Sequence, residues 1–351
     1  MASGAATTVD GSVFSISAVH PDIIKTHILT QLDGPTLAAA ACTSSYFHSL
    51  TSHENLWQEI CTSTWPSVKD PRVQTLISMF PSGHKSLFSD SFPVLDLQPQ
   101  SKHTLDHSLP STTELVSAVD IFYGNNLLFS KVKETETVTG WFQFPPFRID
   151  LLGEKELVPT PISFVGGSDV LLKQLEEKLS LSWIIIDSSG RKAVNLSSRW
   201  PVSVEQHWLT HEVQVKYAVI VAGDDQRWGL FSTREFVEFE IMVTLGGKEG
   251  GEMYVKEVCM QMKDMEEKNL SGRDSLVILQ NSIANGKRKQ VKRDEEKHKY
   301  KEFIVRKAQK KDRKLKVERF LNIGCFSGFI AFCSYKLWVM LLYRIFNYTT
   351  S

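Results

Sequence analysis

Two cysteines and two histidines near the N-terminus have the residue types that most readily suggest chemistry. Cys42, His48, His53 and Cys61 are separated by six, five and eight positions. A zinc finger needs two short pairs of Cys or His ligands at defined spacings, and this series matches no common finger. None of the five cysteines in the chain stands in a CxxC pair. We therefore expect no metal site, no other cofactor and no disulfide.

Other catalytic motifs are missing from the sequence as well. The glycine-rich segment 246–251 (GGKEGG) lacks the GxxxxGK[ST] order of a phosphate-binding loop, and no helical pattern follows it. A hairpin turn explains this segment better. The chain contains neither GxSxG nor HExxH, and acidic pairs such as Asp224-Asp225 and Glu176-Glu177 fall in predicted turns or solvated helices. The sequence thus predicts a protein without catalytic activity.

The middle of the chain has the two-residue period of β-strands. Between residues 115 and 262, runs rich in β-branched and aromatic residues are separated by turn signals such as Gly124-Asn125 and Gly246-Gly247. In this region only residues 169–179 have a helical pattern. Parallel strands need crossover segments of about a dozen residues, so an antiparallel sandwich is favoured. We predict an α+β protein whose β-rich substrate-binding domain spans residues 115–284.

Composition predicts the other boundaries. Residues 1–17 are small and polar, which is typical of a disordered lead. Residues 66–114 are rich in Ser, Pro and His and predict a linker with one short helix near residues 71–80. The remaining predicted segments are a helical module at 18–65, a basic helix at 285–319 and an apolar helix at 320–346.

Residues 19–61 have the pattern of a compact helical module. Pro21 suits the first turn of a helix, where its missing N–H costs nothing, and Asp22 favours the positive end of the helix dipole. The segment Asp33-Gly34-Pro35 ends this helix and starts a second one. Apolar residues recur at helical spacing in a stripe wider than so small a helix needs for its own core, namely Ile23, Ile24, Ile28, Leu29 and Leu32. Such an excess of aliphatic surface indicates a protein-binding face.

The order of these residues resembles the F-box, a three-helix module of similar length. The matching positions are Pro21, Asp22, Ile23, Ile24, Ile28, Leu29, Leu32, Leu37, Cys42, Phe47, Leu50, Leu56 and Trp57. His20 and Thr36 depart from the family pattern, which has Leu and an acidic residue at these places. The wider layout, with a Trp-bearing domain, a basic helix and an apolar tail, is similar to that of a group of plant F-box proteins.

The resemblance implies binding to a Skp-type adaptor, which links F-box proteins to cullin. The residues expected to bind the adaptor are Pro21, Ile24, Ile28, Leu29, Leu32, Leu37 and Trp57. The chain would then recruit a substrate protein, whose identity the sequence does not indicate, to an SCF-type ubiquitin ligase. The β region is also similar in its order of strands, Trp residues and turns to the lectin-like sandwich of phloem protein 2-type F-box proteins. A lectin-like ligand-binding protein that uses its F-box outside a ligase is therefore an alternative.

Several tryptophans of the β region are candidates for contact with a substrate or ligand. Trp200, Trp208 and Trp228 fall near predicted strand ends or loops, where an aromatic ring can stack on a ligand or anchor a peptide. Trp183 lies inside the run LSWIIID and is predicted to belong to the core.

The C-terminal part of the chain is first basic and then apolar. Residues 287–319 contain 16 Lys or Arg against 6 Asp or Glu. The interspersed acids favour a solvated, salt-bridged helix over a nuclear import signal or a nucleic-acid site, so we do not expect nucleic acid as a partner.

The apolar segment that follows is long enough to cross a membrane. Residues 320–343 would be about 36 Å long as a helix. The basic residues before it would keep the N-terminus facing the cytosol or nucleus. Lys336 interrupts the apolar run, so a helix lying in the membrane interface or packed on the sandwich stays open as an alternative.

Overall fold

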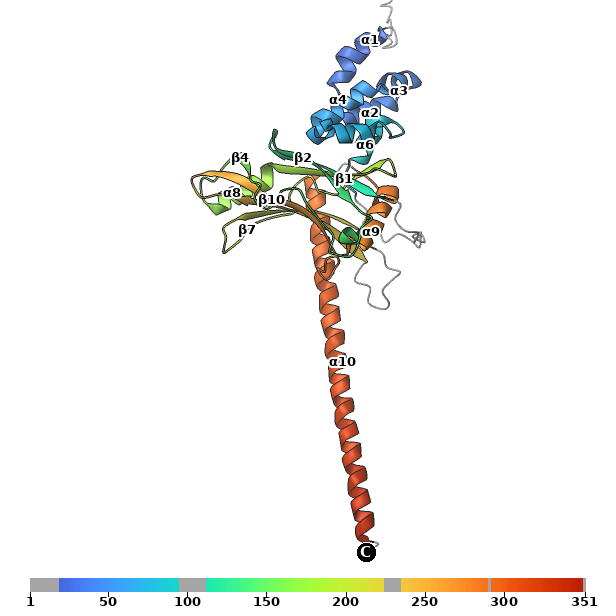
Figure 1. The fold of residues 1–351 in the computed structure, drawn as a ribbon, viewed down its shortest axis with the longest axis vertical. Coiled ribbons are helices and arrows are strands. Elements are labelled where there is room, and N and C mark those ends of the chain that lie inside the picture. The colour runs from blue at the N-terminus through green and yellow to red at the C-terminus, as the bar shows by residue number, and fades with distance from the viewer. Residues whose placement is uncertain (1–18, 95–111, 224–234, 290–291, 350–351) are drawn as a thin grey trace, which may run out of the picture.

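The computed structural model describes residues 19–94, 112–223, 235–289 and 292–349, with side chains described as far as Leu341. The predicted disordered lead at 1–17 and part of the predicted linker lie outside these ranges. Figure 1 shows the N-terminal helices at one end of the molecule, the β-sheets in the middle and a long C-terminal helix that reaches the other end. The predicted α+β class is confirmed.

The N-terminal region begins with one helical segment whose hydrogen-bond pattern changes twice. It consists of α1 (Pro21–Ile23), the π-helical turn η2 (Ile24–Ile28) and the 3₁₀ turn η3 (Leu29–Gln31). The next three helices are α2 (Gly34–Ala41), α3 (Ser45–Thr51) and α4 (Glu54–Thr64). The side chains of Asp33 and Ser44 accept hydrogen bonds from backbone N–H groups in the first turns of α2 and α3. Both residues are therefore N-caps that fix where these helices start.

Residues 66–92 continue this helical domain, so our prediction of an irregular linker was wrong for them. They form η4 (Pro66–Lys69), α5 (Pro71–Ile77) and α6 (Gly83–Asp90). Of these, α5 confirms the short helix predicted near residues 71–80. Val73, Ile77 and Leu87 have no exposed surface and share one core with the preceding helices. The prolines suggested a linker, but two of them begin helices here, where a missing N–H costs nothing.

The β region is a sandwich of two antiparallel sheets, as predicted. The four-stranded sheet has the order β2-β1-β5-β6, and the six-stranded sheet has the order β3-β10-β9-β8-β7, with β4 also paired to β10. The strands of the first sheet are β1 (Glu114–Tyr123), β2 (Asn126–Glu136), β5 (Leu179–Asp187) and β6 (Lys192–Asn195). Those of the second are β3 (Arg148–Asp150), β4 (Val158–Ser163), β7 (Ser203–Gln206), β8 (Val213–Ala222), β9 (Phe236–Gly246) and β10 (Glu252–Lys263).

Three helices accompany the sandwich. The helical pattern at residues 169–179 is confirmed as α8 (Ser168–Lys178). The first part of a predicted strand instead forms the short helix α7 (Gly140–Gln143). The third helix, α9 (Gly272–Asn285), was not predicted, and its Leu279 and Ile283 are buried in the sandwich core.

Alternation along each strand divides its side chains between two cores. In β5, Trp183 and Ile185 belong to the cluster between the two sheets, which confirms Trp183 as a core residue. Their neighbours Ile184 and Ile186 belong to the cluster that the sheet shares with the N-terminal helices. The helices and the sandwich are therefore joined by a common core, and no flexible linker separates them in the described part of the chain.

The C-terminal helix is a single element, α10 (Arg293–Thr349). We predicted a basic helix from residue 285 and a separate apolar helix from residue 320, but the two are continuous and the helix begins at Arg293. With 57 residues, α10 is about 85 Å long. Its first part lies beside the sheets and the rest projects away from them (Figure 1).

Candidate functional site

An exposed apolar surface lies on the first helical segment, at the end of the molecule away from the sheets (Figure 1). Pro21 is exposed, and Ile23 and Ile28 expose 50% and 41% of their surfaces. The π-helical turn causes this arrangement, because the Leu29 N–H donates to the carbonyl of Ile24, five residues earlier. Leu29 therefore joins Ile24 in the core, and Ile28 is turned outward.

Four of the seven residues expected to bind an adaptor are instead buried within the chain. Ile24, Leu29, Leu37 and Trp57 are each 1% exposed or less. The Trp57 indole N–H also donates to the Thr51 carbonyl at 2.7 Å. These residues support the helical core, and a partner cannot reach them in this conformation. This part of the expectation is therefore corrected.

The three remaining candidates and Ile23 form the accessible surface, which we call the apolar tip. It consists of Pro21, Ile23 and Ile28, with the half-buried Leu32 beside them. Ile23 was part of the predicted apolar stripe, although the residues expected to bind the adaptor did not include it. The family pattern contained Ile23, but nothing in the sequence signalled the π-helical turn that exposes it together with Ile28.

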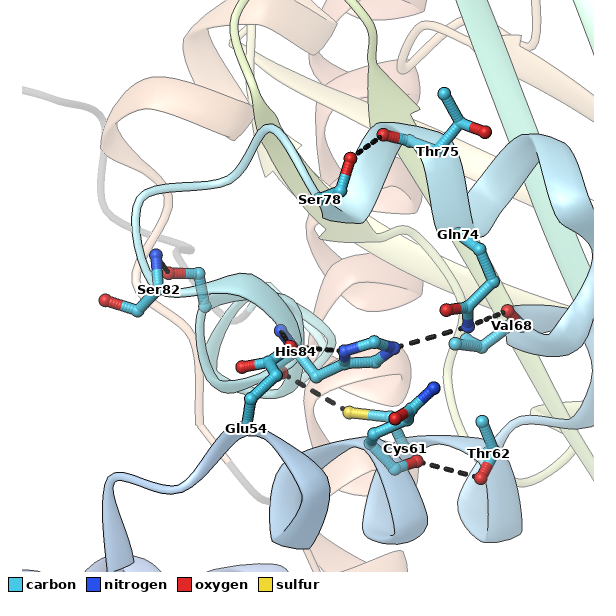
Figure 2. A network of polar contacts seen from close by, with 11 residues as sticks. Glu54, Cys61, Thr62, Val68, Gln74, Thr75, Ser78, Ser82 and His84 are labelled. Carbon is cyan, nitrogen blue, oxygen red and sulfur yellow. Dashed lines mark hydrogen bonds and ion pairs between the residues drawn. The ribbon is translucent and has the colours of Figure 1, made fainter.

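A group around buried Cys61 and His84 in the N-terminal region has the residue types of a cysteine-nucleophile site (Figure 2). Nδ1 of His84 lies 2.5 Å from Glu54 Oε1, and Nε2 lies 3.3 Å from Gln74 Nε2. However, Cys61 Sγ donates to the backbone carbonyl of His84 at 3.3 Å, and burial raises the pKa of this thiol to about 12. A buried, protonated thiol is not a nucleophile. The group instead ties α4, α5 and α6 together.

A second buried group fastens the N-terminal helices to the sandwich. Asp120 of β1 has no exposed surface, and its carboxylate accepts from the Ser67 N–H at 2.9 Å and the Ser67 hydroxyl at 2.6 Å. The Ser130 hydroxyl donates to it at 2.7 Å. Burial raises the pKa of Asp120, and these donors act in the opposite direction. Nearby, Arg72 pairs with Glu114 at 2.5 Å across the same junction.

The candidate tryptophans do not form one site. Trp208 is 81% exposed in the turn between β7 and β8, beside exposed Leu209. Trp200 is half-buried before β7, where the Arg199 guanidinium lies 5.1 Å from its ring centroid. Trp228 lies outside the described residues. Contact between these residues and a substrate stays a prediction. Of the two that the structure describes, Trp208 is the more accessible.

One further tryptophan, which the sequence analysis did not select, is more exposed still. Trp141 of α7 is 91% exposed, and Val138 and Phe144 near it expose 58% and 78%. The sequence pattern suggested a strand here, and a strand would have buried alternate side chains. The short helix removes that alternation and leaves the three apolar side chains in solvent.

A small cavity lies between β8 and α10. It has a volume of about 30 Å³ and is lined by residues that include Val94, Ser198, Ile220 and Tyr300. Binding sites for drug-sized ligands have volumes of roughly 300–1,000 Å³. This cavity is too small for a sugar and gives no support to the lectin-like alternative.

One group of metal-capable side chains occurs among the described residues, at the pairing of β3 with β10. The ligand atoms of Asp150, Glu257 and Cys259 lie within 4.8 Å of one another. The Arg148 guanidinium pairs with Asp150 at 2.7 Å and with Glu257 at 2.6 Å, and burial raises the pKa of the Cys259 thiol to about 12. Metal ligands must be deprotonated and free to bind. The group is therefore better described as an ion-paired surface of the sheet.

The basic half of α10 is not wholly solvated, which corrects our expectation for residues 285–319. Phe303 is 1% exposed and packs in a small cluster with Ile220 and Phe236 of the six-stranded sheet. Lys307 and Lys314 form ion pairs with acidic residues of the β domain. Because the β domain already neutralises part of this basic stretch, less of its charge is available for nucleic acid.

Beyond these contacts α10 is exposed as far as Leu341, where the described side chains end. Among the described helices, α10 is long and apolar enough to cross a membrane, and its most apolar 18-residue stretch is not buried. Phe320, Leu321, Ile323 and Phe326 each expose more than 60% of their surfaces. These side chains are not covered by apolar residues of the part of the chain that the structure describes.

Comparison with known proteins connects the apolar tip to a family. The F-box-like family model matches residues 21–63, which begin at the tip and extend through α4. No solved structure matches the chain.

Similarity to Arabidopsis thaliana proteins extends over most of the chain. F-box protein At2g27310 is 42% identical over 347 residues, which cover 94% of this chain and 97% of the relative. F-box protein At3g44326 is 42% identical, with 90% and 88% covered, and Probable F-box protein At2g36090 is 40% identical, with 92% and 94% covered. The similarity thus includes the sandwich and α10 as well as the helical module, and the chain belongs to the F-box protein family.

Proposed function

We propose that this protein is the substrate-recruiting subunit of an SCF-type cullin ubiquitin ligase. F-box proteins generally act as substrate receptors of such ligases, and the observation that carries the proposal is the F-box-like match at residues 21–63. In this proposal the apolar tip binds a Skp-type adaptor, the adaptor connects to cullin, and the β domain holds the target. The chain itself does no chemistry.

The position of the apolar tip supports this assignment. Ile23 and Ile28 are exposed at the end of the molecule away from the sandwich, where an adaptor would not collide with the β domain (Figure 1). When a partner covers grouped aliphatic side chains, apolar surface is removed from water, which favours the complex.

The rigid junction between the two parts supports a positioning role. Ser67 and Asp120 are buried and hydrogen-bonded between the helices and the sheet. A ligase subunit without catalytic groups acts by holding a target close to the transferring enzyme, which raises the effective concentration of the acceptor lysine. A fixed orientation of the β domain relative to the F-box favours this effect, because a bound target then samples fewer positions relative to the transferring enzyme.

We also propose that α10 anchors the protein in a membrane from Phe320 onward, with the F-box on the cytosolic side. The exposed apolar residues of α10 need an apolar environment, and basic residues immediately precede them. Lys336 lies toward the C-terminal end of the span, where its side chain can extend to the far interface.

Reconstitution of the complex tests the proposed function. The full chain, purified in detergent, is mixed with a Skp-type adaptor and cullin and separated by size-exclusion chromatography. The proposal predicts one complex that contains all three proteins and that forms only when the adaptor is present. Separate elution of the full chain in the presence of both partners would refute the assignment to an SCF-type ligase.

A further inference from the structure

The first part of α10 is held against the β domain along one stripe. Residues three or four positions apart share one face of a helix. Six residues of α10 that contact the β domain follow this spacing: Glu296, Tyr300, Phe303, Lys307, Lys310 and Lys314. The contacts span five turns of the helix, so the docked part cannot pivot about a single point.

The centre of the stripe is buried and charged. The Glu238 side chain has no exposed surface, lies 2.8 Å from Lys216 Nζ of the neighbouring strand and 3.8 Å from Lys307 Nζ of α10. Burial alone would lower the pKa of Lys216, but Glu238 and Glu240 raise it above its ordinary value. Moving α10 away would separate charges that are already desolvated and would expose Phe303, so the docked position is strongly favoured.

The docked part ends close to the start of the apolar part. Lys314 pairs with Glu266 at 2.7 Å, and the long apolar run of α10 begins at Phe320, which is 76% exposed. At 1.5 Å per residue these two positions are about 9 Å apart along the helix axis. The helix is continuous between them, with no Pro or Gly in residues 314–320.

The connection belongs to a short basic segment, residues 311–319, which is exposed. This segment contains five basic residues against the two acids Asp312 and Glu318, namely Lys311, Arg313, Lys314, Lys316 and Arg319. Lys316 pairs with Asp312 at 2.7 Å. A positive segment next to an apolar helix is complementary to the anionic headgroups of a cytosolic leaflet.

We propose that α10 is a rigid strut that holds the β domain directly against the headgroups of an anionic membrane. This inference rests on the membrane anchor proposed above and goes beyond it, because an anchor alone would allow the folded body to move on a stalk. The docked stripe fixes the body to the helix, the apolar part fixes the helix in the bilayer, and the short basic segment leaves room for little more than the headgroup layer.

Energy transfer between the protein and labelled lipids tests the strut. The full chain with its adaptor is reconstituted in vesicles of phosphatidylcholine and phosphatidylserine that contain a headgroup-labelled acceptor lipid. Exposed Cys42, Cys325 and Cys333 are replaced by Ser, and a donor is attached at Lys268→Cys, in the turn that contacts α10. A second preparation carries the donor at Ser63→Cys on α4, in the N-terminal helices. Strong transfer from position 268 and weak transfer from position 63 are expected.

Two insertions between Val317 and Glu318 serve as matched controls. A flexible Gly/Ser segment frees the body, whereas a helical segment of about eleven residues raises it by roughly 16 Å while keeping it rigid. Both should reduce the transfer from position 268 roughly two-fold or more, without loss of vesicle association. If the proteins associate with vesicles but neither insertion changes the energy transfer from position 268, the strut is refuted while the anchor stands. Failure of the full chain to associate with vesicles would refute the anchor, and the strut with it.

Discussion

At the scale of single residues, the junction between the helices and the sandwich depends on Asp120. Its carboxylate has three donors, two of which belong to Ser67 on η4. A buried carboxylate is costly unless it is hydrogen-bonded, so each donor contributes more than a surface hydrogen bond would.

Replacement of Ser67 tests this junction. Ser67→Ala removes the hydroxyl that donates to Asp120 at 2.6 Å but keeps the backbone donor. We expect a loss of about 1–3 kcal/mol in the free energy of unfolding, measured by urea denaturation. Exposed Ser63→Ala is the control and should change stability very little. Equal effects of the two substitutions would contradict the proposed role of Asp120.

Glu296 gives the docking of α10 a predictable pH dependence. This residue is 8% exposed, and its carboxylate accepts from the Arg199 N–H at 3.2 Å. Burial raises its pKa from 4.5 to about 7, although the backbone N–H groups act in the opposite direction. The folded state therefore holds the proton more tightly than the unfolded state. The associated stability is complete below pH 4.5 and is lost as the pH rises through about 7.

The substitution Glu296→Gln should remove this dependence. At pH 8 the free energy of unfolding of the variant should exceed that of the wild type by roughly 2–3 kcal/mol. At pH 4.5 the two proteins should have similar stability. Denaturation at a series of pH values measures the difference. Glu295→Gln is the control, because Lys299 and Lys289 lower the pKa of Glu295 and its removal should give no gain at pH 8. A pH-independent difference for Glu296→Gln would argue against a desolvated carboxylate.

At the scale of elements, α2 and α6 pack unusually closely. A Cβ atom on Gly34 would lie 2.0 Å from Cζ of Phe88, so glycine is required where the chain turns into α2. This contact joins the F-box to residues that follow it in sequence. It explains why residues 66–92 belong to the same folded unit.

A double-mutant cycle tests this packing. Gly34→Ala should destabilise the protein by about 1–3 kcal/mol, because the methyl group overpacks the contact. The same substitution in a Phe88→Ala background should cost less, because the ring that it meets has been removed. Thermal or urea unfolding of the four proteins gives the coupling. Strict additivity would show that the two residues do not press on each other.

The sequence predicted the long, regular strands of the sandwich but not its short strands or its last helix. β5, β8, β9 and β10 are runs rich in β-branched and aromatic residues, and β8 also alternates clearly, so their existence was predictable. The absence of helical crossovers between most of these runs made their antiparallel pairing predictable as well. α9 was missed because its apolar residues follow directly on a β-rich region. β4 and β7 were missed because each is short, and β4 contains Pro159 and Pro161.

The candidate site was predicted less completely than the fold. The F-box pattern identified the right segment, but it could not separate Ile28 from Ile24, because that difference depends on a π-helical turn. The residues that define a family pattern include both core residues and surface residues of a small domain. Only the structure distinguishes a residue such as Leu37, which has no exposed surface, from Ile23, which is half exposed.

At the scale of the whole molecule, the surface proposed to bind an adaptor and the segment proposed to enter a membrane lie far apart. The apolar tip lies at one end and the C-terminal end of α10 at the other (Figure 1). An adaptor bound at the tip would therefore lie on the side of the molecule away from the membrane. This separation makes the anchor and the ligase functions independently testable.

Truncation after Arg319 tests the anchor. The full chain, expressed in cells, should remain with the membrane pellet after alkaline carbonate extraction, because the apolar part of α10 would lose its lipid environment in water. The truncated chain should move to the soluble fraction and should still bind the adaptor, because the apolar tip is unchanged. Retention of the truncated chain in the pellet would show that another part of the protein provides the attachment.

The affinity of the full chain for a Skp-type adaptor is the most direct test of the central claim. Ile23→Asp and Ile28→Asp place carboxylates on the apolar tip without disturbing the core, because both side chains are exposed. Val170→Asp introduces the same change at an exposed apolar residue of α8 and serves as the control. An unpartnered carboxylate buried at an interface costs several kcal/mol, so each tip variant should bind at least about 100-fold more weakly. The control should bind like the wild type, with all variants equally stable to urea. Unchanged binding of both tip variants, or no binding by the wild type, would contradict the account.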